Sequence, residues 1–130
     1  MNTDAHGLEL NDVTYKIIGC MYRVHSALGP GLLESTYEVC LLHELAKNGL
    51  KVERQKALPI VYDGIKLDAA YRIDLLVEDR VIIELKVEDA IANIHKAQVL
   101  SYLKLSKCEV GLLINFNVTD MKKGITRLKA

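Results

Sequence analysis

The chain has 130 residues, of which 50% are apolar and 26% are charged, and its formal net charge at pH 7 is zero. A chain of this length typically forms one hydrophobic core, so we expect a single domain over residues 1–130. Since 17 basic residues balance 17 acidic ones, no overall field draws the chain to nucleic acid or to a membrane. Any anion site must come from a local group of side chains.

The cysteines, Cys20, Cys40 and Cys108, are odd in number and form no C-x-x-C pair. This pattern indicates thiols in a reducing compartment and argues against a disulfide framework, a zinc ribbon or a four-cysteine iron–sulfur site. No basic-plus-apolar leader opens the chain, and no apolar run reaches the roughly 18 residues of a membrane span. We therefore expect a cytoplasmic protein with no membrane partner.

A first helix is expected after a loose terminus, residues 1–10, that shows no periodicity. Asn11 or Asp12 can cap this helix. Its apolar residues recur at spacings of three and four, which predicts one face packed on a core: Val13, Ile17, Met21, Val24 and Leu28. The segment Gly29-Pro30-Gly31 then ends the helix.

The second helix is expected from about Pro30 to Asn48, with Gly49 as its C-cap. Three residues form the centre of its apolar stripe: Tyr37, Leu41 and Leu45. At about 100° per residue, Glu34 falls inside this stripe, where a carboxylate is costly unless it is paired or bound to a metal. Alternatively, Glu34 lies in the first turn, partly exposed, and the helix dipole stabilises it.

A run of β-strands is expected in the middle of the chain. Residues 52–62 and 65–77 predict a hairpin around the turn Asp63-Gly64, with Pro59 on an edge strand or at a bulge. A second turn leads into a strand over residues 81–87.

The last part of the chain predicts a helix and then a buried strand. The helix is expected from about Asp89 to Leu105. Three apolar residues mark its predicted core face: Ile91, Ile94 and Leu105. The strand Val110–Asn115 follows, and the basic tail over residues 122–129 can add an edge strand. The order ααβββαβ predicts an α/β domain in which helices flank a mixed β-sheet.

The central hairpin, residues 71–87, has one apolar face, and this face determines its register, since a slip of one residue would mix the two faces. The pairs expected on the apolar face are Val77–Val81, Leu75–Ile83 and Ile73–Leu85. The three-residue loop that this register requires lacks the preferred glycine.

The opposite face of the hairpin then has Asp74 opposite Glu84 and Arg72 opposite Lys86. Like charges directly opposed across strands repel, so this arrangement favours a bound cation. Mg²⁺ takes one or two carboxylates, keeps several waters and contacts substrate phosphates. Lys86 would then lie near the attacking water and a phosphate oxygen, and Arg72 would be a further phosphate contact.

A solvated face is the alternative interpretation of Glu84 and Lys86, because Glu-x-Lys is common on exposed strands. Convergence favours a site, since Glu34 and Gln98 place polar groups on the inner stripes of the two helices expected to flank the sheet. The four histidines show no metal-ligand spacing, and no phosphate-binding glycine loop or nucleophile elbow occurs.

These residues also carry a resemblance to a known family. Asp74, then Glu84-Leu85-Lys86 on the next strand, then Gln98-x-x-x-Tyr102 on the following helix resemble the motifs of the PD-(D/E)XK nuclease superfamily, particularly its RecB-type branch. Residues 31–37, GLLESTY, are similar to the signature of the GxxExxY protein family, a small branch of that superfamily. The similarity extends to the late Arg127 and implies a restriction-endonuclease-like α/β core.

The resemblance implies a metal-dependent nuclease with Mg²⁺ or Mn²⁺ as cofactor. The implied metal ligands are Asp74, Glu84, the Leu85 carbonyl and Glu34. By the same resemblance Lys86 assists the attacking water, and Gln98 and Tyr102 position the lysine or the nucleic-acid backbone.

Three hypotheses follow for the function. The first is a Mg²⁺- or Mn²⁺-dependent nuclease, with DNA favoured over RNA as the partner. The second is a non-catalytic nucleic-acid-binding or regulatory module that keeps the nuclease fold, which the neutral net charge and small size favour. The third is a protein-interaction module, such as a homodimer formed through the first helix.

Overall fold

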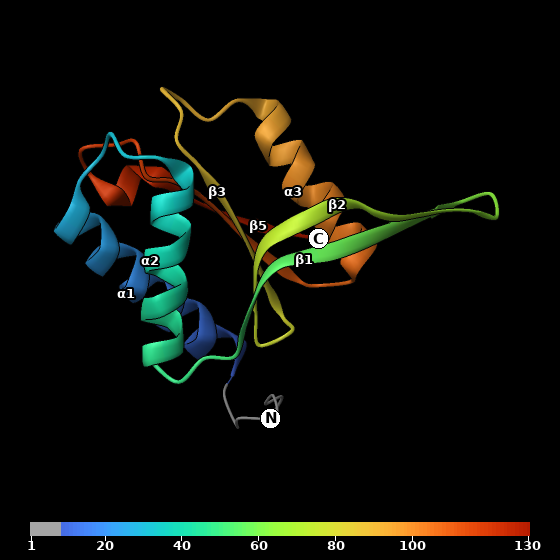
Figure 1. Ribbon diagram of the computed structural model, residues 1–130, viewed down its shortest axis with the longest axis horizontal. Coiled ribbons are helices and arrows are strands. Elements are labelled where there is room, and N and C mark those ends of the chain that lie inside the picture. The colour runs from blue at the N-terminus through green and yellow to red at the C-terminus, as the bar shows by residue number, and fades with distance from the viewer. Residues whose placement is uncertain (1–8) are drawn as a thin grey trace.

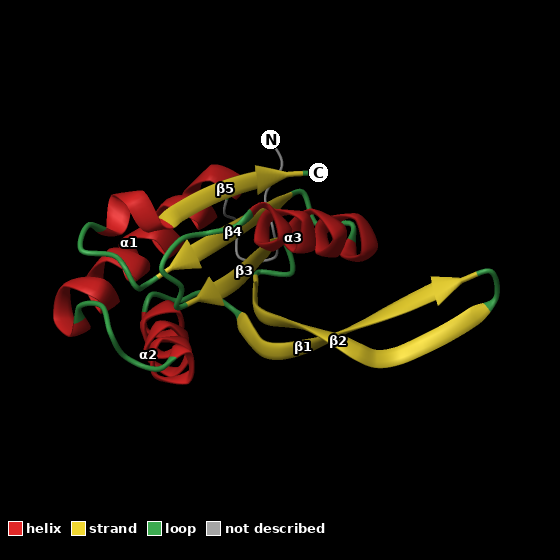
Figure 2. Ribbon diagram, turned by 90° about the horizontal axis from the view of Figure 1, so that it is seen from above, coloured by secondary structure: helices red, strands yellow, loops and turns green. Residues whose placement is uncertain are grey.

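Helices cover both faces of a five-stranded mixed β-sheet (Figures 1 and 2). The computed structural model describes residues 9–130, except for the side chains of residues 69 and 70. The helices are α1 (Leu10–Leu28), α2 (Glu34–Lys47), α3 (Asn93–Ser106) and the 3₁₀ helix η1 (Met121–Gly124). The strands are β1 (Val52–Tyr62), β2 (Ile65–Val77), β3 (Val81–Lys86), β4 (Val110–Asn115) and β5 (Ile125–Lys129). They lie side by side in the sheet in the same order as in the chain. Strands β3 and β4 are parallel, and the other pairs are antiparallel.

The sheet separates two hydrophobic cores. Helices α1 and α2 pack on one face, where Ile17, Tyr37 and Phe116 are fully buried. Helix α3 packs on the other face through Val99 and Leu103. Covered on both faces, the central strands can be apolar throughout. The predicted α/β architecture, a mixed sheet between helices in the order ααβββαβ, is confirmed, and the predicted basic edge strand is β5.

The predicted register of the central hairpin is confirmed near its turn and wrong farther from it. Leu75 pairs with Ile83, and the β2–β3 ladder has no pair beyond this one toward Asp74. Ile73 therefore does not lie opposite Leu85. It packs in the core beneath α3, whereas Leu85 packs in the core beneath α1 and α2. The physical reason is that β2 leaves β3 at this point and continues with β1 alone. The predicted Arg72–Lys86 pair is likewise outside the ladder.

The turn between β2 and β3 forms without glycine because Lys51, the residue before β1, stabilises it. Glu78 and Asp79 both have left-handed backbones, with φ of 55° and 56°, which disfavours residues other than glycine. The Glu78 N–H donates to the Lys51 carbonyl (2.8 Å), and the Glu78 carboxylate accepts the Lys51 N–H (2.5 Å). The Lys51 ammonium also pairs with Asp79 at 2.8 Å.

Helix α1 begins earlier than predicted. Leu10 is its first residue and Glu9 its N-cap, so neither Asn11 nor Asp12 caps it. The rest of the predicted terminus, residues 1–8, lies outside the described residues. Within residues 9–130, none of the helices combines the length and hydropathy needed to span a membrane.

Helix α2 begins four residues later than predicted, at Glu34 instead of Pro30. The Tyr37 hydroxyl donates to the Gly29 carbonyl (2.5 Å) and accepts the Leu32 N–H (3.1 Å), so the segment between them is held as a loop. At the other end the C-cap is Asn48, so the predicted Gly49 C-cap is wrong by one residue; Gly49 follows it with a φ of 79°.

Helix α3 also begins later than predicted, because the chain after β3 is held as a loop. The side chain of Asn115 accepts the Glu88 N–H (3.1 Å) and donates to the Glu88 carbonyl (2.9 Å). The predicted core face is wrong for Ile94, which is 72% exposed, and for Leu105. The buried residues of α3 are Val99, Tyr102 and Leu103.

The far part of the β1–β2 hairpin, residues 59–70, extends beyond the rest of the sheet and is termed the arm (Figure 2). Its turn at Asp63-Gly64 has two left-handed residues, with φ of 47° and 78°, as a tight hairpin requires. The register of β1 and β2 shifts between Leu58 and Ile60, so Pro59 occupies an irregularity on an edge strand, as predicted.

We predict that Gly111→Ala destabilises the protein by about 1–3 kcal/mol, because overpacking strains a close-packed core. A Cβ at Gly111, in β4, would lie 2.6 Å from a methyl carbon of Val99 in α3. Urea unfolding measures the effect. Gly19→Ala in α1 is the control, because its Cβ would meet only the Arg23 side chain at 3.7 Å and beyond. Equal stabilities of the two variants would contradict the prediction.

Candidate metal-binding and catalytic site

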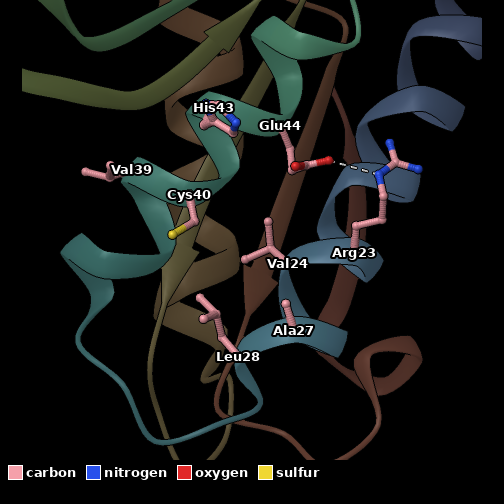
Figure 3. Close-up of a pocket in the computed structure, with 8 residues that line it drawn as sticks. All are labelled: Arg23, Val24, Ala27, Leu28, Val39, Cys40, His43 and Glu44. Carbon is pink, nitrogen blue, oxygen red and sulfur yellow. Dashed lines mark hydrogen bonds and ion pairs between the residues drawn. The ribbon is translucent and has the colours of Figure 1, made fainter.

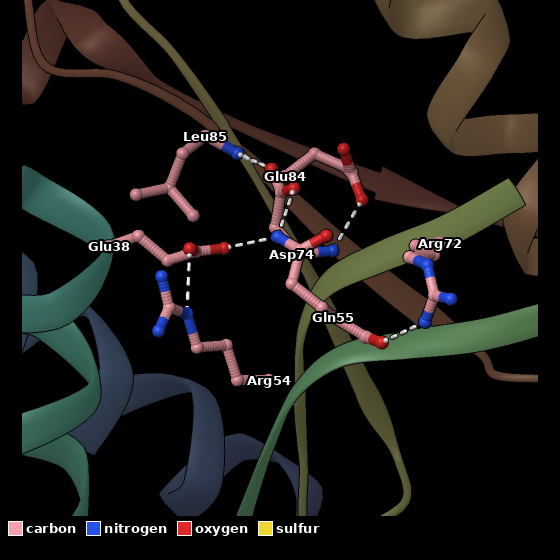
Figure 4. A network of polar contacts seen from close by, with 7 residues as sticks. All are labelled: Glu38, Arg54, Gln55, Arg72, Asp74, Glu84 and Leu85. Atoms are coloured by element: carbon pink, nitrogen blue, oxygen red, sulfur yellow. Dashed lines mark hydrogen bonds and ion pairs between the residues drawn. The ribbon is translucent and has the colours of Figure 1, made fainter. Parts of the chain in front are cut away.

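Asp74 of β2 and Glu84 of β3 meet where the β2–β3 ladder ends (Figure 4). The Asp74 N–H donates to Glu84 Oε1 at 3.1 Å, and the Leu85 N–H donates to Asp74 Oδ2 at 2.9 Å. Each carboxylate thus binds an N–H group of the neighbouring strand. Asp74 and Glu84 are therefore close together, as predicted, but they meet through their side chains, beyond the last backbone pair of the ladder.

Burial raises the pKa of both acids. Glu84 is 4% exposed, and burial followed by the charge of Asp74 raises its pKa to about 8. The pKa of Asp74 is also raised, chiefly by burial. The charge of Asp74 acts directly on the pKa of Glu84, so the two acids are electrostatically coupled. The pair therefore titrates as a unit, and we term it the carboxylate pair.

Gln55 of β1 holds Asp74 from the other side. Its backbone is left-handed, with a φ of 52°, and the rung that it would form with Asp74 is missing from the β1–β2 ladder. Its amide donates to Glu38 Oε1 at 2.6 Å and to Asp74 Oδ1 at 3.3 Å. The sequence did not reveal this residue, because nothing in the local pattern marks a left-handed glutamine within a strand.

Glu38 is the buried carboxylate of α2, with an exposed fraction of 6%. Arg54 of β1 donates to it at 2.9 Å, and the charge of Glu38 contributes to the raised pKa of Asp74. Sequence reasoning missed Glu38, although a signal existed. On a helical wheel it lies about 20° from Leu45, as close to the apolar stripe as Glu34.

Glu34 is exposed and occupies the first turn of α2, which is the position given by the alternative interpretation of this residue. It is nevertheless electrostatically coupled to the carboxylate pair. Partial desolvation and then Asp74 raise the pKa of its carboxyl group, while Lys86 lowers it. The loop closed by Tyr37, whose ring stacks on Phe116 at 4.5 Å, places the start of α2 beside the site.

Lys86, the last residue of β3, is half-buried. Its charge lowers the pKa of both Glu84 and Glu34. Among the described residues, no hydrogen bond or ion pair holds its ammonium group. The group is therefore available to a ligand bound at the carboxylate pair.

Helix α3 brings Gln98 and Tyr102 to the same region. The Gln98 amide donates to the Tyr102 hydroxyl at 3.2 Å, and burial and then the charge of Glu84 raise the pKa of Tyr102. Gln98 and Lys86 together line a pocket of about 360 Å³. Arg72, in contrast, is exposed and donates to the Gln55 carbonyl at 3.2 Å.

The carboxylate pair fits a hard divalent cation, although the implied four-ligand set is not assembled. Within residues 9–130, no three acidic, histidine or cysteine side chains converge at metal-ligand spacing. Glu34 therefore does not complete a site with Asp74 and Glu84. Two carboxylates are enough for Mg²⁺, which usually keeps several water ligands. The pair also has raised pKa values, as expected for acids that lack a compensating charge.

A separate apolar pocket of about 410 Å³ lies between α1 and α2 (Figure 3). Val24, Leu28 and Val39 line it, and the ion pair of Arg23 with Glu44 (3.0 Å) closes one side. None of the residues of the carboxylate pair or of α3 contributes to its lining. A homodimer formed through α1 would cover this pocket, and that arrangement stays a prediction.

We predict that the metal-free protein loses stability as the pH rises from about 4.5 to 8. Because burial raises the pKa of Glu84 from its ordinary value of 4.5 to about 8, the stabilisation is complete below pH 4.5 and is lost as the pH passes 8. The loss is up to about 1.4 kcal/mol per pH unit. Urea unfolding across this range should show a flatter profile for Glu84→Gln. Parallel profiles for the variant and the parent would contradict the raised pKa.

One of three comparisons with known proteins identifies the family of this chain. A family model described as the PD-(D/E)XK nuclease superfamily matches residues 11–128. No curated protein matches the chain. The crystal structure of SSO0001 shares 18% identity and has a TM-score of 0.43, with 90% of this chain and 64% of that chain covered. The chain thus spans less than two thirds of SSO0001, and a likeness of this degree carries no weight for function. The family model spans nearly all of α1, all of α2 and α3, and the carboxylate pair. The chain therefore belongs to the PD-(D/E)XK nuclease superfamily.

Proposed function

We propose that this protein is a metal-dependent nuclease that hydrolyses phosphodiester bonds in DNA, and that it belongs to the GxxExxY branch of its superfamily. The superfamily indicates nuclease-type activity, and its members typically use divalent metals. The observation that carries the proposal is the contact between Asp74 and Glu84, two acids with raised pKa values, beside the unpaired ammonium of Lys86. Such perturbed groups cluster at functional sites.

In this proposal Asp74 and Glu84 hold Mg²⁺ or Mn²⁺, with the Leu85 carbonyl as a further ligand. The cation supplies Lewis-acid stabilisation of the phosphate and eases deprotonation of the attacking water. Water oxygen forms the new bond to phosphorus while the bond from phosphorus to a sugar oxygen breaks, and the water proton leaves as that oxygen is protonated.

The chain's own residues position the reactants. Lys86 orients the attacking water and stabilises negative charge that develops on the phosphate. Gln98 and Tyr102, which are joined by a hydrogen bond, hold Lys86 and the nucleic-acid backbone in place. Glu34 contributes negative charge at the edge of the site without contacting the carboxylate pair, and Arg72 is a further phosphate contact.

We predict cleavage of labelled DNA in the presence of Mg²⁺ or Mn²⁺ and none in the presence of a chelator. Lys86→Ala should lower the rate about a hundredfold or more, because it removes a charge used in the transition state. It should leave the fold intact, since Lys86 forms no ion pair with any residue of the described part of the chain. Labelled RNA is tested in parallel.

Lys129→Ala is the matched control for this assay, because Lys129 is an exposed lysine at the end of β5. It should cut DNA as the parent does. If Lys86→Ala also retains the parental rate, the catalytic role of Lys86 is wrong. Within residues 9–130 no third ligand converges on the pair, which favours the alternative, a non-catalytic nucleic-acid-binding or regulatory module. Binding of DNA without cleavage under any metal condition would support that alternative.

We predict that Mg²⁺ or Mn²⁺ raises the melting temperature, because only the folded state brings the two acids together. The stabilisation is about 2.7 kcal/mol when free metal exceeds its Kd a hundredfold. Above pH 8, where Glu84 is ionised, Asp74→Asn should melt at a higher temperature than the metal-free parent, since it removes the repulsion, and it should lose the response to metal. Asp79→Asn, a surface acid in the same hairpin, should keep the metal response. A response that survives Asp74→Asn would place the metal elsewhere.

A further inference from the structure

A second pocket, of about 370 Å³, adjoins the site on the side of the arm. Its lining comes from the base of the arm and from α3: Ile60, Tyr71, Gln98, Ser101, Tyr102 and Leu105. Gln98 and Ser101 also line the pocket that contains Lys86. The two pockets are therefore adjacent along one side of α3, one beside Lys86 and the other at the base of the arm.

Tyr71 gives this second pocket an accessible aromatic ring. It lies on β2, three residues before Asp74, and is 45% exposed. Its ring meets the buried ring of Tyr102 edge-on, with centroids 6.4 Å apart and an interplanar angle of 63°. Ile60 and Leu105 add apolar surface, while Ser101 and Gln98 add groups that can form hydrogen bonds. The lining thus combines an aromatic platform with a few polar atoms.

We propose that this pocket, termed the Tyr71 pocket, binds an unpaired nucleobase of the strand whose phosphate lies at the carboxylate pair. This inference rests on the proposed function and specifies its substrate as a single strand, or a duplex with an unpaired end. Aromatic side chains bind bases of any sequence by stacking. In a duplex the base faces are already stacked on their neighbours, so a base must be unpaired to occupy the pocket.

The net charge of the protein also favours a substrate with an unpaired base. Binding along a duplex relies on many contacts between cations and phosphates, whereas this chain has no net charge. Near the site, Lys86 and the exposed Arg72 supply local positive charge. With few phosphate contacts available, stacking in the Tyr71 pocket supplies a larger share of the binding free energy, and it requires an unpaired base.

Binding without cleavage tests the inference directly. Fluorescence anisotropy in the presence of a chelator compares a labelled single-stranded DNA, the same sequence as a blunt duplex, and the same duplex with an unpaired tail. An RNA strand of the same sequence identifies the sugar preference. We expect the single strand and the tailed duplex to bind at least tenfold more tightly than the blunt duplex. Equal affinities for the single strand and the blunt duplex would overturn the inference.

Substitutions at Tyr71 locate the effect. Tyr71→Ala should weaken binding of the single strand roughly five- to a hundredfold, the range for loss of one stacked base, and Tyr71→Phe should retain the parental affinity. Tyr62→Ala is the matched control, because Tyr62 is a 74% exposed tyrosine of the same hairpin. It should bind as the parent does. A parental affinity for Tyr71→Ala, or an equal loss for Tyr62→Ala, would contradict the Tyr71 pocket.

The inference and the proposed function fail in distinguishable ways. If the protein binds single strands through Tyr71 but cuts no substrate with any metal, the pocket stands and the nuclease activity is wrong. If it cuts blunt duplexes as fast as single strands and Tyr71→Ala cuts equally well, the nuclease activity stands and the pocket is wrong. A strand that lacks bases at successive positions should bind the parent protein as weakly as the intact strand binds Tyr71→Ala. If the parent binds both strands with equal affinity, the pocket is also contradicted.

Discussion

The contact between Asp74 and Glu84 is the interaction on which the rest of this structure depends. Each carboxylate accepts a backbone N–H of the opposite strand. If the β2–β3 ladder continued, such N–H groups would donate to backbone carbonyls instead. Burial makes this arrangement costly, since it raises the pKa of both acids. The protein therefore keeps two acids that resist ionisation at the place where β2 and β3 separate, and a cation bound there would stabilise their ionised forms.

The separation of the strands also shapes the surroundings of the pair. Beyond Leu75, β2 pairs only with β1, and together they form the arm whose base carries Tyr71. The parallel neighbour β4 holds β3 in place and aligns Lys86 with Asn115. Helix α3 packs over this junction and adds Gln98 and Tyr102. One break in strand pairing thus brings together acids, a lysine and an aromatic pocket.

The parts of the fold that follow from periodicity were predictable, and the parts decided by distant contacts were not. The alternation of apolar residues in β2 and β3 is enough to align Leu75 with Ile83 and so to bring Asp74 to Glu84. The face of α3 was not predictable, because its apolar residues point in several directions, and the absence of a side chain at Gly111 of β4 decides which of them packs closest. The role of Gln55 was not predictable either, because it depends on how strands β1 and β2 are aligned.

Gln55 shows how strain and hydrogen bonding oppose each other at the site. A left-handed backbone costs a residue other than glycine about 1–2 kcal/mol, and glycine would remove that cost. Glycine would, however, lose the amide that binds both Glu38 and Asp74, which would leave two acids near each other without their shared donor. Hydrogen bonds to charged groups contribute about 1.5–3 kcal/mol each, which exceeds the strain. A glutamine in a strained conformation is therefore more stable here than a relaxed glycine, and the strain persists because the acids of the site require it.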